Sequence, residues 1–447
     1  MAGGTFDPKV DEVRPGSYIN IKSKKVESSG SAVRGITAIP LINHNYGPAG
    51  EFIKLTNAAP DAAYAKLGYS VYDKEMLLVK EAFKGASTVY VYIIAGDGKN
   101  ATATGGGVSA TAKYAGTRGN DFKYAITANP VGGFDVTVYL GESKVSNYVG
   151  IKSAEELVAI ADPYLTFTAA EAAELVAVAS VSLTGGTDAA AVTKNYTDFL
   201  DAIEVITLNS FAFPVTGDDA ESLKSAAKTK VDYLWNSCGK RVHAAVPDFK
   251  ADCEFIINVT NGVVLTDGTE VDKVKACAWV AATYAGASKT TSNTGAKYEG
   301  AIDILDKKGN EEAKAAIKNG EFFFSFSEEG DVVVEYDINS LITFGGDVDS
   351  SYRKNRVQRV FDNTASLVKT TFPPNKYDND PTGWNVMDGI GASLLLGEQE
   401  DGAIKNVDEK TDFAVDRSKS EGDRTYFDIH IQPVDSSEKL YFSIWTN

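Results

Sequence analysis

A short alternation of apolar and polar residues near the N-terminus predicts a β-strand. It runs through Tyr18, Ile19, Asn20, Ile21 and Lys22, and places Ile19 and Ile21 on one face. Glycine, proline and serine residues on both sides of this strand give residues 1–30 the composition of an extended arm. A single strand of this length cannot bury its own apolar face, so we expect it to pair with another strand.

The chain also ends on two runs with strand periodicity, Tyr426–Val434 and Leu440–Trp445. The second run consists of Leu440, Tyr441, Phe442, Ser443, Ile444 and Trp445. Its first, third and fifth residues are aliphatic or aromatic and share one face, whereas Tyr441 and Trp445 lie on the other. The pattern predicts a strand with large apolar side chains on both faces.

Between the two ends, the hydrophobic pattern changes three times. Residues 31–95 are predicted to be mixed α/β, and the Gly-rich segment after Gly96 opens a small β-rich domain over 96–183. In that domain, Ser153 with Glu156 and Thr168 with Glu171 are capping-box patterns that predict two helices. Residues 184–345 alternate between strand and helix periodicity, which favours a parallel α/β layer. Residues 346–447 are predicted to be α+β.

One amphipathic helix is predicted over Ser351–Thr371, ending at Pro373-Pro374. Its spacing places Arg353, Arg356 and Arg359 along one stripe, with Lys354 beside them. Two interpretations stay open for this basic stripe. It is either a solvated face with local ion pairs, or a surface that docks onto an acidic protein partner.

The formal net charge of −17 changes which partners are plausible. A strongly acidic surface is repelled by phosphate groups, so nucleic-acid binding is not expected to be the main function. No apolar run reaches the roughly 18–20 residues that a membrane-spanning helix needs. The N-terminal residues lack the apolar core of a secretory signal, so we expect a protein made and kept in the cytoplasm until it is assembled or released by lysis.

Candidate catalytic residues are sparse. The three histidines, His44, His243 and His430, form no zinc-binding spacing, and the sequence has no nucleophile elbow, phosphate loop or dinucleotide fingerprint. The three cysteines contain no CxxC pair, and reduced, buried thiols are the expected interpretation. Cys238 and His243 leave a Cys/His dyad open. We therefore expect no catalytic site, no metal and no cofactor.

Several motifs, taken in order along the chain, resemble those of one known family. They are RPGSYIN at 14–20, YAGTRGND at 114–121, LTGGTD at 183–188 with alanine at 189, NGV at 261–263, and IQPVDSSEKLYFSI at 431–444. The sequence resembles the tail sheath proteins of contractile phages, and of phage-tail-like bacteriocins, of Gram-positive bacteria. One departure is local, because residues 373–383 are loop-like where a longer continuous helix is expected.

The resemblance implies a multidomain fold of mixed α+β and α/β type. The N- and C-terminal segments would form one core domain with extended arms. A subtilisin-like α/β domain without a catalytic triad and a small β-sandwich would be inserted into that core. It also implies a mechanical function, in which six-fold helical rings of the protein surround an inner tail tube and contract to drive the tube through a cell envelope.

The resemblance also implies partners and roles for the segments described above. The partners would be other copies of the chain, the inner tail tube, the baseplate and the tail terminator. The strands at Tyr18–Lys22 and Leu440–Trp445 would pair with neighbouring subunits, and the basic stripe from Arg353 to Arg359 would touch the tube. Two other hypotheses are a hydrolase built on the α/β layer and an acidic surface-layer or adhesion protein.

Overall fold

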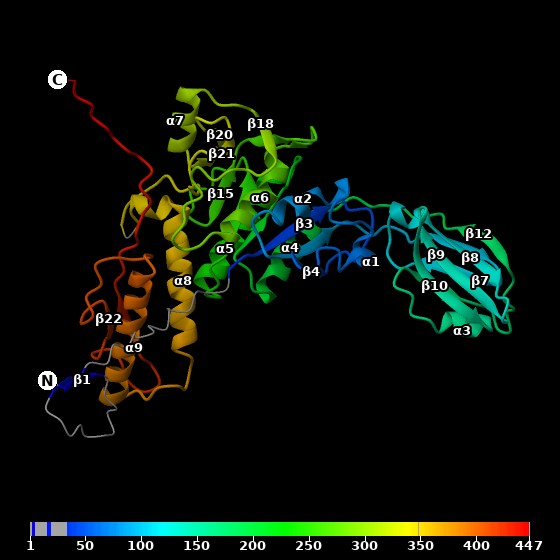
Figure 1. The fold of residues 1–447 in the computed structure, drawn as a ribbon, viewed down its shortest axis with the longest axis horizontal. Helices are drawn as coiled ribbons and strands as arrows, with labels where there is room; N and C mark the ends of the chain where they lie inside the picture. The colour runs from blue at the N-terminus through cyan, green and yellow to red at the C-terminus, as the bar shows by residue number, and fades with distance from the viewer. Residues whose placement is uncertain (1, 5–15, 19–33, 347, 447) are drawn as a thin grey trace. The chain divides into compact units, whose positions relative to one another are not determined.

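The computed structural model describes residues 2–4, 16–18, 34–346 and 348–446 (Figure 1). The chain divides into two compact units. One comprises Met1–Ala32 with Asn363–Val434, and the other comprises Val33–Asp362 with Asp435–Asn447. None of the described helices is long and apolar enough to cross a lipid bilayer.

A seven-stranded sheet forms the centre of the larger unit, in the order β19-β15-β14-β13-β3-β5-β4. All neighbours are parallel except β4 and β5, which are antiparallel. The strands are β3 Ile36–Ile42, β4 Phe52–Thr56, β5 Thr88–Ile94, β13 Ser210–Ala212, β14 His243–Pro247, β15 Ile256–Val259 and β19 Glu321–Phe322. Strands β13, β14 and β15 are buried at every position, as expected for parallel strands covered on both faces.

The sheet combines segments that the sequence analysis placed in different domains. Strand β3 pairs with β13 through the register Thr37–Ser210 and Ala38–Phe211. Residues 31–95 and 184–345 therefore contribute to one sheet rather than to two separate layers. Hydrophobic periodicity detects each strand but carries no information on which distant strand lies beside it.

Helices cover both faces of this sheet. On one face, α2 (Leu77–Ala82) and the alanine-rich α6 (Lys273–Gly286) pack in a core that contains Val89, Val91 and Ile93. On the other face, α4 (Thr193–Ala202) and α5 (Ala220–Asn236) pack in a core with Tyr92 and Ile94. The alternation along β5 explains this division, because successive side chains of a strand point to opposite faces. Strand β13 begins at Ser210, after the 3-10 turn η3 (Ile203–Val205) that follows α4.

Further small elements surround the central sheet. They are α1 Tyr64–Leu67, η1 Lys74–Met76, η3 Ile203–Val205, β16 Gly262–Leu265, β17 Glu270–Val271, β18 Ala301–Leu305, α7 Asn310–Lys318, β20 Phe324–Phe326, β21 Val332–Val334 and η4 Ser350–Arg353. Strands β16, β17 and β18 form a three-stranded antiparallel sheet, and β20 pairs with β21.

A β-sandwich lies between β5 and β13 in the sequence. Its two sheets have the orders β10-β9-β8-β12 and β11-β7-β6 and enclose a core of aromatic and aliphatic side chains. The elements are β6 Thr102–Gly105, β7 Val108–Ala112, η2 Thr117–Asp121, β8 Phe122–Ala128, β9 Phe134–Leu140, β10 Ser143–Ile151, α3 Ala154–Val158, β11 Leu165–Thr168 and β12 Val178–Ser182. The mixed α+β fold and the sandwich agree with the sequence-based expectation.

Only one of the two helices predicted in the sandwich is present. Ser153 caps α3, because its hydroxyl accepts a hydrogen bond from the backbone N–H of Glu156 at 3.2 Å. The helix predicted to open at Thr168 is wrong, because Thr168 is the last residue of β11 and pairs with Ser109 of β7. Because Thr168 pairs with a neighbouring strand, it cannot also serve as the N-cap of a helix.

The smaller unit contains helix α9 (Pro381–Glu400), strands β22 (Phe413–Val415) and β23 (Phe427–Ile429), and the second half of α8 (Asn355–Thr371). Helix α9 was not predicted from the sequence. Its start has a clear signal, since the Asp380 carboxylate accepts from the backbone N–H of Gly383 at 2.7 Å and Pro381 is the first helical residue. Four glycines within the helix hide this signal from a propensity-based assignment.

Two of these glycines give a matched test of packing in the smaller unit. A Cβ atom added at Gly391 would lie inside the ring of Phe413, whereas one added at Gly389 meets nothing within 4 Å. We therefore expect Gly391→Ala to reduce the free energy of unfolding by about 1–3 kcal/mol through overpacking. Gly389→Ala should raise it by up to about 1 kcal/mol, because alanine favours the helix. Chemical denaturation of both variants checks this, and equal effects would contradict the packing.

Candidate assembly segments

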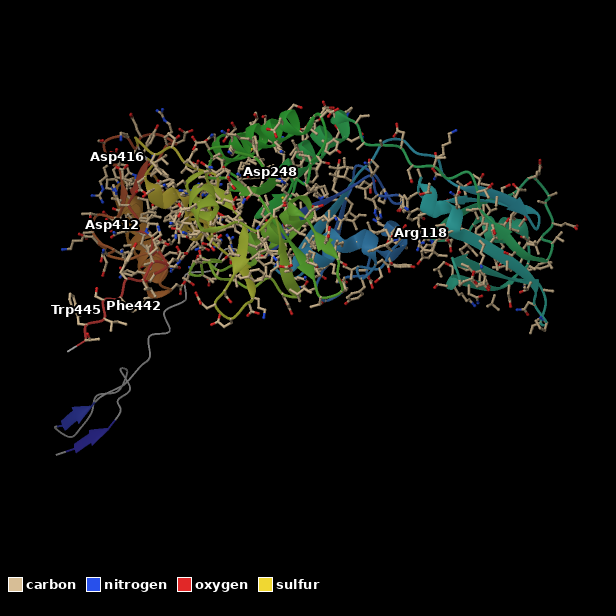
Figure 2. The ribbon with its side chains drawn as sticks, turned by 90° about the horizontal axis from the view of Figure 1, so that it is seen from above. Arg118, Asp248, Asp412, Asp416, Phe442 and Trp445 are labelled. Atoms are coloured by element: carbon tan, nitrogen blue, oxygen red, sulfur yellow. The ribbon has the colours of Figure 1, made fainter. Side chains whose placement is uncertain are left out.

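The C-terminal segment does not form a strand in the isolated chain. Residues 436–446 have no regular secondary structure, and of the predicted strand Tyr426–Val434 only β23 forms, paired with β22. Leu440, Tyr441, Phe442, Ile444 and Trp445 are 63%, 90%, 82%, 91% and 87% exposed. Figure 2 shows Phe442 and Trp445 standing out from the ribbon. A run of large apolar side chains exposed to this degree has the character of a binding segment without its partner.

The residues just before this segment are fixed to the larger unit. Lys354 forms an ion pair with Glu438, and the Ser292 hydroxyl donates to the same carboxylate at 2.6 Å. The Arg356 guanidinium donates to the Ser436 hydroxyl at 2.6 Å. The chain is therefore held at residues 436–438 and exposed from Leu440 onward.

These contacts change the interpretation of the basic stripe. Arg359 is 0% exposed, and its guanidinium donates to Asp337 at 2.8 Å and to the backbone carbonyl of Thr291 at 2.6 Å. Lys354 and Arg356 are also buried, and only Arg353 is partly exposed. A solvated basic face was therefore the wrong interpretation. These side chains bind acidic and polar groups of their own chain, and the predicted helix begins at Asn355 rather than Ser351.

The predicted N-terminal strand lies mostly outside the described residues. Tyr18 is the last residue of β2 (Gly16–Tyr18), which pairs in parallel with β1 (Ala2–Gly4). Ile19, Asn20, Ile21 and Lys22 lie outside the described residues. The subunit-joining role of this segment stays a prediction.

Family models match consecutive parts of the chain. Residues 34–93 match the tail sheath protein Gp18 domain III N-terminal region, and 96–188 match the phage tail sheath protein beta-sandwich domain. Residues 189–340 match the central domain of phage tail sheath proteins, and 347–446 match their C-terminal domain. The phage-like element PBSX protein XkdK of Bacillus subtilis (strain 168) is 34% identical, over 100% of both chains. The chain belongs to the phage tail sheath family.

Solved structures support the assignment of this chain to the sheath family. A sheath tail protein from Desulfitobacterium hafniense is 33% identical, with a TM-score of 0.81 over 96% of this chain and 99% of that chain. The helical sheath of the anti-feeding prophage in its contracted state is only 11% identical. It shares the fold, with a TM-score of 0.55 over 98% of this chain and 100% of that chain. The resemblance to tail sheath proteins inferred from sequence motifs is confirmed, and the chain is a tail sheath subunit.

The sheath protein also contains a buried charge cluster that the sequence analysis missed. Asp362, near the middle of α8, accepts from Arg241 at 2.8 Å and from the Tyr284 hydroxyl at 2.8 Å. His243 lies 3.2 Å from the same carboxylate and Arg34 lies 3.9 Å from it. The five residues come from four distant parts of the sequence, so no local pattern joins the whole cluster.

The acidic member of this cluster is ionised in the folded sheath protein. Burial by itself raises the pKa of the Asp362 carboxyl, but His243, Arg241 and Arg34 outweigh that effect and hold the pKa well below its usual range. The ring of His243 faces this carboxylate, whereas the Cys238 thiol lies 4.0 Å from Glu204. The histidine that was considered for a Cys/His dyad is therefore bound to Asp362.

Proposed function

We propose that this sheath subunit polymerises into six-fold helical rings around an inner tail tube, and that contraction of the polymer drives the tube through a cell envelope. The observation that carries the proposal is the exposed C-terminal segment, Leu440–Trp445, held at its base by Glu438. The alternating side chains of such a segment suit addition to the edge of a neighbour's sheet, where backbone hydrogen bonds supply affinity. The predicted strand at Tyr18–Lys22 would provide the second joint.

The proposed assembly involves several partners. They are other copies of the chain, the inner tube, the baseplate and the tail terminator, in a virion tail or bacteriocin particle assembled in the bacterial cytoplasm. In the inner-tube contact proposed for the stripe from Arg353 to Arg359, only Arg353 is partly exposed in the described conformation. Lys354, Arg356 and Arg359 would act by holding α8 and the base of the C-terminal segment in place.

A structural role rather than an enzymatic one is part of the proposal. The α/β layer around the seven-stranded sheet would correspond to a subtilisin-like domain without a catalytic triad, and so would serve as a rigid body. Within that layer, the Asp362–His243 pair is buried and contacts Arg34, Arg241 and Tyr284. A structural ion-pair network is the simplest account of this chemistry.

Negative-stain electron microscopy of the purified, overexpressed chain tests the assembly. We expect striated hollow tubes or rings, because sheath subunits carry both halves of every joint that the polymer needs. If the chain stayed uniformly monomeric, both alone and with purified inner tube present, the proposed polymer would be contradicted.

A further inference from the structure

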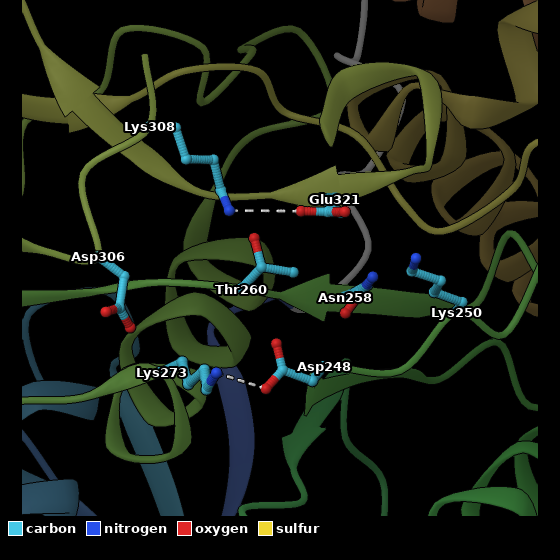
Figure 3. A pocket seen from close by; sticks show the side chains of 8 residues that line it. All are labelled: Asp248, Lys250, Asn258, Thr260, Lys273, Asp306, Lys308 and Glu321. Carbon is cyan, nitrogen blue, oxygen red and sulfur yellow. Dashed lines mark ion pairs between the residues drawn. The ribbon is translucent and has the colours of Figure 1, made fainter. Parts of the chain in front are cut away.

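A polar pocket of about 390 Å³ lies near the carboxyl ends of the parallel strands β14 and β15 (Figure 3). Asp248 and Lys250 follow β14, Asn258 and Thr260 lie at the end of β15, and Glu321 opens β19. Lys273, Asp306 and Lys308 complete the lining. Ligands of parallel α/β sheets bind outside the carboxyl ends of the strands, where loops leave a crevice. All eight lining side chains are polar or charged, so a ligand here is polar throughout.

One buried donor in the pocket has no partner among the described residues. Asn258 is 0% exposed, and its side-chain oxygen accepts from the backbone N–H of Phe249 at 2.7 Å. This bond fixes the orientation of the amide, so the side-chain nitrogen is the group left to donate to a ligand. That nitrogen makes no hydrogen bond in the described part of the chain, and neither does the hydroxyl of Thr260. An unpaired buried donor is unfavourable and is satisfied by a bound acceptor.

The charges around this donor determine the sign of the acceptor. Asp248 is paired with Lys273 at 2.6 Å, and Glu321 with Lys308 at 3.6 Å, which neutralises two of the three carboxylates. Lys250 is exposed, and in Figure 3 the amide nitrogen of Asn258 is turned towards the side on which Lys250 lies. An amide donor beside an ammonium group suits an oxyanion. Asp306 lies on the opposite side in the same view, where it would accept a hydrogen bond from a hydroxyl group.

We propose that this pocket binds a small hydroxylated oxyanion. Its phosphate or carboxylate group accepts from the Asn258 amide and Lys250, and its hydroxyl groups donate towards Asp306. The volume exceeds what a bare inorganic anion fills and lies at the lower end of the range of small-molecule sites. The site is separate from the assembly segments, so the proposal does not depend on polymerisation.

Isothermal titration calorimetry of the full chain with glycerol phosphate tests the site, at constant ionic strength set with chloride. We expect saturable binding of glycerol phosphate. Inorganic phosphate should bind more weakly, because it has no glycerol hydroxyl groups that could extend to Asp306 and donate to it. Asn258→Asp keeps the acceptor for Phe249 but replaces the donor with a negative charge, and should weaken binding at least tenfold. Lys250→Gln, at an exposed position, should weaken it about three- to tenfold.

Lys318→Gln is the matched control, because Lys318 is an exposed lysine of α7 that does not line the pocket. It should bind glycerol phosphate as the parent chain does. The absence of saturable heat with either ligand would overturn the proposal, and so would parent-like affinity in Lys250→Gln. The second result decides the matter even if Asn258→Asp does not fold, because a substitution at the surface position 250 leaves the core unchanged.

Discussion

Replacing Asp362 with asparagine should reduce the free energy of unfolding of the larger unit by about 3–5 kcal/mol, because it removes one partner of a buried ion-pair network. The carboxylate side chain is 9% exposed and bonds to Arg241 and Tyr284 at 2.8 Å each. Asparagine has nearly the same volume, so the loss would come from charge rather than from a cavity. Urea denaturation followed by tryptophan fluorescence measures it, since Trp235 lies against Arg241 and His243.

Asp303→Asn provides the matched control. Asp303 pairs with Lys307 at 2.6 Å, but its side chain is 46% exposed, and exposed pairs contribute about 0–1 kcal/mol. If the two substitutions had equal effects, the buried network would have no special role in stability.

The same carboxylate should make stability depend on pH. Because the pKa of Asp362 is lower in the folded chain than in the unfolded chain, its contribution is complete above the ordinary aspartate value of about 4. The contribution is lost as the pH falls from there towards the folded pKa. Between pH 5 and pH 3, the parent chain should therefore lose more stability than Asp362→Asn. Parallel curves for the two proteins would contradict this origin of the pH dependence.

Removing residues 440–447 should abolish self-assembly while the subunit remains folded. The removed residues include five large side chains that are 63–91% exposed, and Glu438, which anchors the segment to Lys354, is retained. Removing them takes no large apolar contact from the core, so the melting temperature should stay within about 2 °C of the parent, the shift expected for a change under about 0.5 kcal/mol. Electron microscopy and sedimentation of the truncated chain check both parts of the expectation.

Two point variants distinguish specific pairing of the C-terminal segment from nonspecific association of exposed apolar side chains. Phe442→Asp places a charge on one face of the predicted strand and should reduce polymer yield severely. Val131→Asp changes a residue that is 98% exposed in the turn between β8 and β9, and should have little effect. Parent-like tubes from the truncated chain would show that the C-terminal segment is not a joint.

Local patterns were sufficient for much of the fold. The strands β3, β5, β14 and β15 consist mostly of apolar residues, and such short apolar runs led to the α/β prediction for residues 31–95 and 184–345. The exposed apolar character of Leu440–Trp445 also follows from sequence alone, since its large side chains occupy both faces of one short strand. These features depend on residues that are close together in the chain.

The errors concern interactions between distant residues. Arginine spacing placed Arg353, Arg356 and Arg359 on one stripe, but periodicity does not reveal that Asp337 and Thr291 cover Arg359. The Asp362 cluster and the oxyanion pocket were missed for the same reason, because their members are collected from several strands and loops. Helix α9 was missed on local grounds, since its glycines outweighed the Asp380-Pro381 start signal.

The pairing of β3 with β13 has a consequence for how the chain is made. About 170 residues, including the whole β-sandwich, separate Ile42 from Ser210. At a synthesis rate of about 5–20 residues per second, β3 leaves the ribosome roughly 8–34 s before β13 does, and β5 roughly 6–23 s before it. During that interval one edge of β3 has no neighbour, and an open apolar edge invites pairing with another nascent chain. In a cell that produces many copies of the subunit at once, a chaperone that shields this edge would raise the yield of folded protein.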